Sequence, residues 1–149
     1  MTLTLASAEE TARFGARIAA SLRPGDVVAL SGDLGAGKTT LARGLLRGLG
    51  FGGEVASPTF PIVIAYDPPD TRLPLWHVDL YRIAGAAEIE QLALDEARID
   101  AALIVEWPER LGAALWPDAL RLRLEAAGEG ARALTAEVPP AWGGRWPSV

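Results

Sequence analysis

Apolar residues recur along the chain with two periods, and these periods predict its secondary structure. Side chains spaced by four, at Phe14, Ile18 and Leu22, predict a helix over residues 8–22 with Ser7 as its N-cap. Further helical patterns cover residues 38–49 and 88–102. Short apolar or alternating runs predict strands at residues 3–5, 26–30, 61–66, 75–79, 103–105, 120–125 and 131–138.

The order of these elements predicts the fold class. Helices alternate with strands, which favours an α/β fold with a mostly parallel sheet flanked by helices. The last two strands surround a Gly-Glu-Gly turn at 128–130 and predict an antiparallel C-terminal hairpin. Residues 1–138 are expected to form a single domain. Residues 139–149, which contain Pro, Gly and two Trp, are expected to form an irregular C-terminal tail.

Residues 32–39, Gly-Asp-Leu-Gly-Ala-Gly-Lys-Thr, match the P-loop or Walker A pattern G-x-x-x-x-G-K-[ST] at every fixed position. An apolar strand precedes the motif and a helix follows it, so main-chain N–H groups and the helix dipole can converge on phosphate oxygens. This context predicts a P-loop NTPase-like fold that binds a nucleoside triphosphate. The predicted nucleotide contacts are Asp33, Gly35, Ala36, Gly37, Lys38, Thr39 and Thr40. Lys38 would reach the β- and γ-phosphates, and the Thr39 hydroxyl would bind Mg²⁺.

The composition distinguishes Lys38 from the other basic residues and excludes several classes of function. Of the 14 basic residues 13 are Arg, which suggests that the single Lys serves where a flexible point charge is needed. The 19 acidic residues bring the net charge to −5, so binding of nucleic acid by bulk charge is not expected. The absence of Cys excludes disulfides, thiolate zinc sites and Cys nucleophiles. No apolar run approaches the ~18 residues of a membrane span, so a cytoplasmic protein is expected.

Two carboxylates follow predicted strands and are candidates for the rest of an NTPase site. The carboxyl ends of parallel strands meet at the edge where a P-loop opens, so Asp79 and Glu106 could both reach a metal ion there. Glu106 follows the more apolar strand and is predicted to bind Mg²⁺. Asp79 is predicted to orient or deprotonate the attacking water, or to hold a metal-bound water. The alternative for each carboxylate is that it caps the next element.

Three further residues have two open interpretations each. Thr59, in the loop after the P-loop helix, is either a switch hydroxyl on the γ-phosphate side or an ordinary polar loop residue. Trp107 either stacks at the rim of the site or packs in the core. His77, the sole histidine, is expected to be packed and hydrogen-bonded rather than catalytic.

The identity of the nucleotide can be inferred by excluding guanine. GTPases of the Ras type read guanine with an [NT]-K-x-D segment, which a chain without Asn and with its one Lys in the P-loop cannot contain. ATP is therefore the expected nucleotide. A small-molecule P-loop kinase remains the alternative function. It is disfavoured because Arg82, Arg98 and Arg110 are scattered and no Arg-rich lid is evident.

Four blocks together carry a family resemblance. They are residues 31–40 around the P-loop, 57–60 (Ser-Pro-Thr-Phe), 77–82 (His-Val-Asp-Leu-Tyr-Arg) and 105–108 (Val-Glu-Trp-Pro). In this order and spacing the sequence resembles the TsaE family (formerly YjeE), which takes part in bacterial tRNA threonylcarbamoyladenosine biosynthesis. The resemblance covers roughly residues 3–138.

The resemblance implies more than the residues alone. Family members bind ATP and Mg²⁺, hydrolyse ATP slowly alone and associate with the TsaB–TsaD heterodimer. TsaD transfers a threonylcarbamoyl group to adenosine 37 of ANN-reading tRNAs, and turnover by TsaE resets the complex. By the same resemblance Lys38, Asp79 and Glu106 are catalytic, Thr39 and Glu106 bind the metal, Thr59 is switch-like and Trp107 lies by the nucleotide. Little direct tRNA binding is expected of such an accessory protein.

Overall fold

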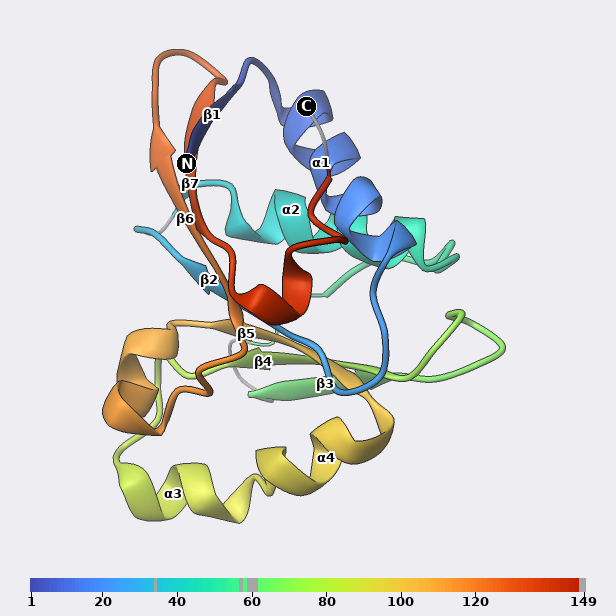
Figure 1. The fold of residues 1–149 in the computed structure, drawn as a ribbon, viewed down its shortest axis with the longest axis vertical. Helices are drawn as coiled ribbons and strands as arrows, with labels where there is room; N and C mark the ends of the chain where they lie inside the picture. The colour runs from blue at the N-terminus through green and yellow to red at the C-terminus, as the bar shows by residue number, and fades with distance from the viewer. Residues whose placement is uncertain (34, 57, 59–61, 148–149) are drawn as a thin grey trace.

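Strand β2 (Val27–Ser31), which leads into the P-loop, is covered on both edges by parallel neighbours, β5 (Ala102–Glu106) and β6 (Leu120–Ala126). The computed structural model describes residues 1–33, 35–56, 58 and 62–147. Within these residues the strands form one seven-stranded sheet in the order β1-β7-β6-β2-β5-β4-β3. The P-loop strand is therefore central in the sheet (Figure 1).

The remaining strands and the helices are bounded as follows. The strands are β1 (Thr2–Leu5), β3 (Val63–Tyr66), β4 (Leu75–Asp79) and β7 (Arg132–Glu137). The α-helices are α1 (Ala8–Ala20), α2 (Lys38–Gly48), α3 (Ala86–Gln91) and α4 (Leu94–Asp100). Two 3₁₀ helices, η1 (Pro108–Ala114) and η2 (Pro140–Trp142), follow β5 and β7.

The predicted sheet class is confirmed. Strands β6, β2, β5 and β4 pair in parallel, and β5 is buried along its whole length, as expected for a strand covered on both faces. The predicted C-terminal hairpin is β6 and β7, which pair antiparallel. Antiparallel pairs also form both edges of the sheet, where β1 joins β7 and β3 joins β4. In the described residues, no helix is long and apolar enough to cross a membrane.

Helices cover both faces of the sheet. Ala102 and Ile104 of β5 belong to the core cluster under α1 and α2, whereas Leu103 and Val105 belong to the cluster that includes Leu94 at the start of α4. Figure 1 shows α1 and α2 on one side of the central strands and α3 and α4 on the other.

Helix α1 fixes the position of the P-loop helix α2. The two helices pack so closely that a Cβ atom at Gly15 would overlap the backbone of Leu41, and one at Gly44 would overlap the backbone of Ala12. Glycine is therefore required on both sides of this contact. Leu45 of α2 and Ile18 of α1 are almost wholly buried in the same cluster.

The prediction of one helix over residues 88–102 is wrong. The chain breaks at Ala93, which has a left-handed φ of 54°, and forms the two short helices α3 and α4. The break lets Leu94 pack into the core, where it is 4% exposed. Ala102 belongs to β5 because it pairs with Leu75 of β4 and is completely buried. Strand pairing and burial therefore override a helical pattern.

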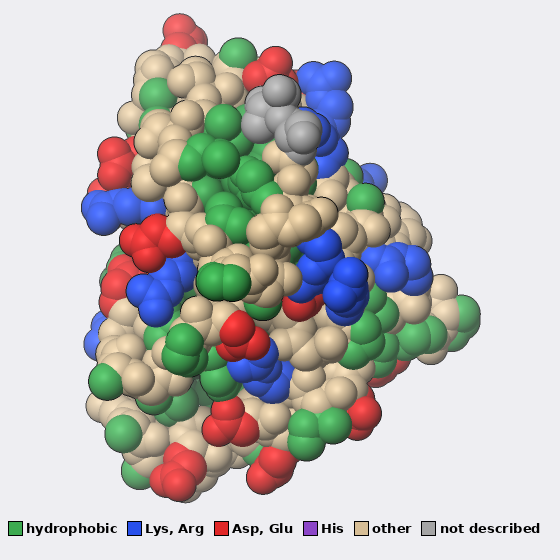
Figure 2. Space-filling view, in the orientation of Figure 1, with side chains coloured by type: hydrophobic (Ala, Val, Ile, Leu, Met, Phe, Trp, Pro, Cys, Tyr) green, Lys and Arg blue, Asp and Glu red, His purple; other side chains and the backbone are tan. Residues whose placement is uncertain are grey.

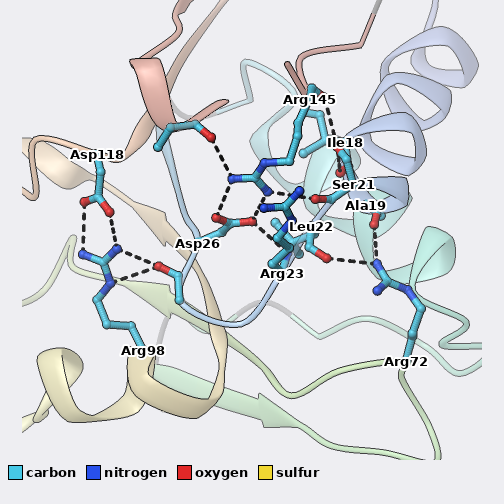
Figure 3. A network of polar contacts seen from close by, with 12 residues as sticks. Ile18, Ala19, Ser21, Leu22, Arg23, Asp26, Arg72, Arg98, Asp118 and Arg145 are labelled. Carbon is cyan, nitrogen blue, oxygen red and sulfur yellow. Dashed lines mark hydrogen bonds and ion pairs between the residues drawn. The ribbon is translucent and has the colours of Figure 1, made fainter. Parts of the chain in front are cut away.

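Residues 139–147 differ from the expected irregular tail, because they contain η2 and pack against the body of the protein. Trp142 is fully buried, and the ring of Trp146 meets that of Phe14 edge-on at 5.5 Å. The Arg145 guanidinium donates to both carboxylate oxygens of Asp26, at 2.6 and 3.0 Å, just before β2 (Figure 3). This pair raises the pKa of Arg145 through its hydrogen bond to Asp26. The segment therefore packs at the amino end of β2, which is the end opposite the P-loop.

Trp142→Ala is expected to lower the free energy of unfolding by about 3–5 kcal/mol, because it empties a fully buried indole site. Denaturant unfolding of the nucleotide-free protein measures the change. Ile99→Ala is the control, since Ile99 is 73% exposed and its truncation should cost no more than about 0.5 kcal/mol. A Trp142→Ala cost as small as that of the control would show that the segment contributes no packing energy.

Candidate nucleotide-binding site

The P-loop connects the end of β2 to the start of α2. Gly37 caps α2 with a φ of 102° and no side-chain hydrogen bond, so the first-turn N–H groups of the helix keep their capacity to bind an anion. Asp33 and Gly35 are exposed, while Ala36 is buried and its N–H donates to the Asp33 carbonyl at 3.0 Å. The predicted strand, loop and helix sequence is therefore present around the motif.

Lys38 is buried at the first position of α2. Its Nζ donates to the Gly32 carbonyl at 2.7 Å and lies 4.1 Å from the centre of the Trp107 ring. An ammonium over an indole face is stabilised by the negative charge of that face. Thr39 and Thr40 follow in the first turn of α2 and are half-buried. The structure thus brings Lys38 and Trp107 together, from sequence positions far apart.

Asp79 and Glu106 lie side by side at the carboxyl ends of β4 and β5. The two residues are register partners, and Glu106 also lies opposite Leu30, at the end of the P-loop strand. Their exposures are 6% and 5%, so both carboxylates are nearly enclosed. Asp79 Oδ1 accepts the Tyr81 N–H at 2.9 Å. The two predicted acids are therefore neighbours next to the phosphate loop.

Burial raises the pKa of Asp79 above its ordinary value, and repulsion from Glu106 raises it further. The Tyr81 N–H, Lys38 and His77 act in the opposite direction but do not cancel the effect. An ionised Asp79 consequently costs folding free energy in the absence of a metal.

His77 is fully buried and hydrogen-bonded, as expected, and its partner is a site carboxylate. Its Nε2 lies 2.6 Å from Glu106 Oε2, and its Nδ1 has no partner among the described residues. An ionised carboxylate only accepts hydrogen bonds, so we place the proton of this contact on Nε2. His77 thereby holds one oxygen of Glu106, and the second oxygen remains for another ligand.

Trp107 connects this acidic pair to the outer wall of the site. It has a left-handed φ of 58°, unusual for a bulky residue, and its ring lies 4.8 Å from that of Tyr81. Trp107 also lines a cavity of about 570 Å³ between the P-loop and β6, to which Gly32, Ala36 and Arg123 contribute. That volume falls in the range of small-molecule sites.

The side chains at this site are suitable ligands for Mg²⁺ bound together with a nucleotide. The Thr39 hydroxyl and the carboxylates of Glu106 and Asp79 are the hard oxygen ligands that Mg²⁺ prefers, and Mg²⁺ usually takes only one or two carboxylates beside phosphate oxygens and water. In the described ranges no group of three or more His, Cys, Asp or Glu could hold a metal by itself. A metal here would accordingly need the phosphates as additional ligands.

Two further sets of residues were singled out from the sequence, namely Thr59 and the arginines considered for a kinase lid. Thr59 lies outside the described residues. Two of the arginines considered for a kinase lid have other partners: Arg98 donates to Gly25 and Asp118 at the opposite end of β2, and Arg110 donates to the Tyr81 carbonyl. One contact was missed altogether, that of Arg132 with the P-loop, because the two positions are 97 residues apart and no motif joins them.

Fold and site together define a P-loop protein of the nucleotide-binding α/β class, and the comparisons with known proteins specify the family. Residues 5–134 match the family model described as threonylcarbamoyl adenosine biosynthesis protein TsaE. The Streptomyces coelicolor protein named tRNA threonylcarbamoyladenosine biosynthesis protein TsaE is 50% identical over 114 residues, which cover 76% of this chain and 77% of that protein. The Bacillus subtilis protein of the same name is 41% identical over 128 residues, covering 85% and 78%.

A solved structure agrees with these relatives. The crystal structure of YdiB from Bacillus subtilis superposes with a TM-score of 0.76 at 33% identity, covering 95% of this chain and 88% of that one. The chain belongs to the TsaE family, whose members act in tRNA threonylcarbamoyladenosine biosynthesis. Nucleotide binding follows for this chain from the P-loop fold of the family.

Asp79→Asn is expected to raise the Tm of the nucleotide-free and metal-free protein by about 1–3 °C at pH 7. The amide still accepts the Tyr81 N–H but removes the buried charge. Because the folded-state pKa of Asp79 is raised, the wild type loses stability as pH rises through that pKa, and the two proteins should converge as pH falls below about 4.

Asp118→Asn serves as the control of opposite sign. The hydrogen bond from Arg98 lowers the pKa of Asp118, so its neutralisation should lower the Tm slightly at pH 7. Thermal unfolding between pH 4 and pH 8 measures both variants. A lower Tm for Asp79→Asn at pH 7 would contradict the unfavourable effect of the buried Asp79 carboxylate on stability.

Proposed function

We propose that this protein is a Mg²⁺-dependent ATPase that serves the TsaB–TsaD complex in threonylcarbamoyl modification of tRNA adenosine 37. The observation that carries the proposal is the convergence of three side chains: Asp79 and Glu106 at the carboxyl ends of adjacent parallel strands, and Lys38 at the start of the helix that follows the neighbouring strand β2. A phosphate loop alone binds a nucleotide, whereas neighbouring carboxylates add what hydrolysis requires. Family membership supports the pathway.

Each residue has a role suited to its position. Main-chain N–H groups at the start of α2 would bind the phosphates, and Lys38, whose ammonium has donors beyond the one on the Gly32 carbonyl, would neutralise their charge. Thr39 and the free oxygen of Glu106 would hold Mg²⁺, which neutralises charge that develops on the phosphates. Asp79, with its raised pKa, would orient the attacking water or accept its proton.

The contact between Lys38 and Trp107 supports a link between the nucleotide and a partner. A phosphate oxygen that binds the Lys38 ammonium would compete with the Trp107 ring for the same cation, while the ammonium has donors enough to keep the Gly32 carbonyl as well. Binding of ATP would therefore change the environment of Trp107, and with it that of Tyr81. A nucleotide can alter partner affinity only through such a difference between two conformations.

The charge distribution favours a protein partner over direct tRNA binding. The net charge is −5, and on the face shown in Figure 2 Lys and Arg form small separate groups among Asp and Glu. Proteins that bind nucleic acid directly usually present a continuous basic surface. Action on tRNA would accordingly pass through the TsaB–TsaD heterodimer, in the cytoplasm.

Lys38→Ala is expected to weaken ATP binding at least about tenfold, because it removes the cation that faces the phosphates. Isothermal titration calorimetry measures the affinity. Arg43→Ala is the control, because it removes one exposed positive charge from the same helix. Equal losses in the two variants would indicate only long-range electrostatics and would remove the P-loop lysine from the site.

Glu106→Gln is expected to lower ATP hydrolysis at least about a hundredfold with TsaB–TsaD present and to raise the Mg²⁺ concentration required. ATP binding without Mg²⁺ should change little, since the amide can still accept from His77. Glu129→Gln at the exposed hairpin tip is the control. Superimposable Mg²⁺ titrations of Glu106→Gln and wild type would contradict the metal role.

The whole proposal is tested by measuring phosphate release from ATP with and without purified TsaB–TsaD. We expect slow release alone and faster release with the complex, in proportion to formation of threonylcarbamoyladenosine in tRNA. Release that the complex leaves unchanged would contradict the accessory role. Transfer of the γ-phosphate to a small acceptor would instead establish the kinase alternative.

A further inference from the structure

Arg132 reaches from the C-terminal hairpin to the P-loop. It is the first residue of β7, paired with Leu5 of β1 and Ala126 of β6. One terminal nitrogen of its guanidinium donates to the Gly35 carbonyl at 3.2 Å, and the other donates to the Ala131 carbonyl at 2.8 Å. A single side chain thus joins the hairpin to the loop.

The rest of the side chain lies against the last glycine of the P-loop. A Cβ atom at Gly37 would be 3.3 Å from Arg132 Nε and 3.5 Å from its Cγ. Arg132 Nε is buried and has no hydrogen-bond partner among the described residues. No ion pair joins Arg132 to a carboxylate in the same set of residues, and the two hydrogen bonds of its terminal nitrogens there go to carbonyl oxygens.

The direction of the Gly35 carbonyl explains what this contact can do. A loop that turns its N–H groups toward an anion must turn carbonyl groups away from it, and those carbonyls need donors of their own. Arg132 supplies one such donor at Gly35. A guanidinium beside the positive end of α2 is also electrostatically unfavourable until an anion binds there.

We propose that Arg132 is a positioning residue for the nucleotide, which braces the P-loop through the Gly35 carbonyl and makes phosphate affinity depend on the C-terminal hairpin. The proposal rests on the proposed nucleotide binding and adds a residue outside the P-loop motif to it. Arg suits the role because its planar fork spans two carbonyls, whereas a Lys ammonium is a single point charge.

The experiment compares Arg132→Gln, Arg132→Lys and Arg121→Gln. Arg121 lies on β6, is exposed and forms a 3.8 Å ion pair with Glu137, so its substitution removes the same charge at a position away from the loop. Calorimetry measures the affinity of each protein for Mg²⁺-free ATP and for inorganic pyrophosphate. Amide resonances of Gly35, Ala36 and Gly37 in the nucleotide-free proteins report the loop itself, and thermal unfolding reports global stability.

We expect Arg132→Gln to weaken both ligands about tenfold, the order expected for one hydrogen bond from a charged donor, with the Tm kept within about 2 °C. Arg132→Lys should remain several-fold weaker than wild type, and both variants should shift the three loop resonances. Arg121→Gln should bind within twofold of wild type and leave those resonances in place.

Several results would overturn the proposal. Full affinity in Arg132→Lys would mean that charge alone suffices, and equal losses in Arg132→Gln and Arg121→Gln would mean general electrostatics. Unchanged loop resonances in Arg132→Gln would show that Arg132 does not hold the P-loop in position. If wild type bound no ATP, the proposed function would fail, and the resonances of the nucleotide-free protein would still decide whether Arg132 holds the loop.

Discussion

The parallel pairing of β5 between β2 and β4 is the constraint on which the site depends. It aligns Glu106 with Leu30 on one side and with Asp79 on the other. The two carboxylates and the P-loop therefore meet at the carboxyl ends of the parallel strands. A slip of one residue would turn Glu106 to the opposite face of the sheet. The wholly buried β5, apolar up to its last residue, fixes that register.

The same pairing places two acids in a nearly enclosed position, and this burial must be compensated locally. His77 holds one oxygen of Glu106, and the Tyr81 N–H holds one oxygen of Asp79. The Tyr81 contact reduces the cost of ionising Asp79 without removing it, since the pKa of Asp79 stays raised. The folded state therefore carries an electrostatic burden at the edge where a metal cation would relieve it.

At the other end of β2, arginine side chains bridge several acceptors and join the segments that meet there. Arg145 joins Asp26 to the Ser21 and Ala141 carbonyls, and Arg98 joins Asp118 to Gly25 (Figure 3). Planar forks suit such bridges better than ammonium groups do. Arg98 and Arg145 are thus two positions where Lys would serve less well, whereas the P-loop holds the one Lys.

Most of the fold could be predicted because most of its strands and helices follow from patterns of neighbouring residues in the sequence. The apolar run of β2 and the Walker A motif placed the strand, loop and helix correctly, and strand-end acids pointed to Asp79 and Glu106. The break at Ala93, the burial of Trp142 and the contact of Arg132 with Gly35 arise from packing between distant segments, which periodicity does not encode. Motif reading finds the groups that would touch a ligand, whereas the contact of Arg132 with the phosphate loop comes from β7, a strand far from the loop in the sequence.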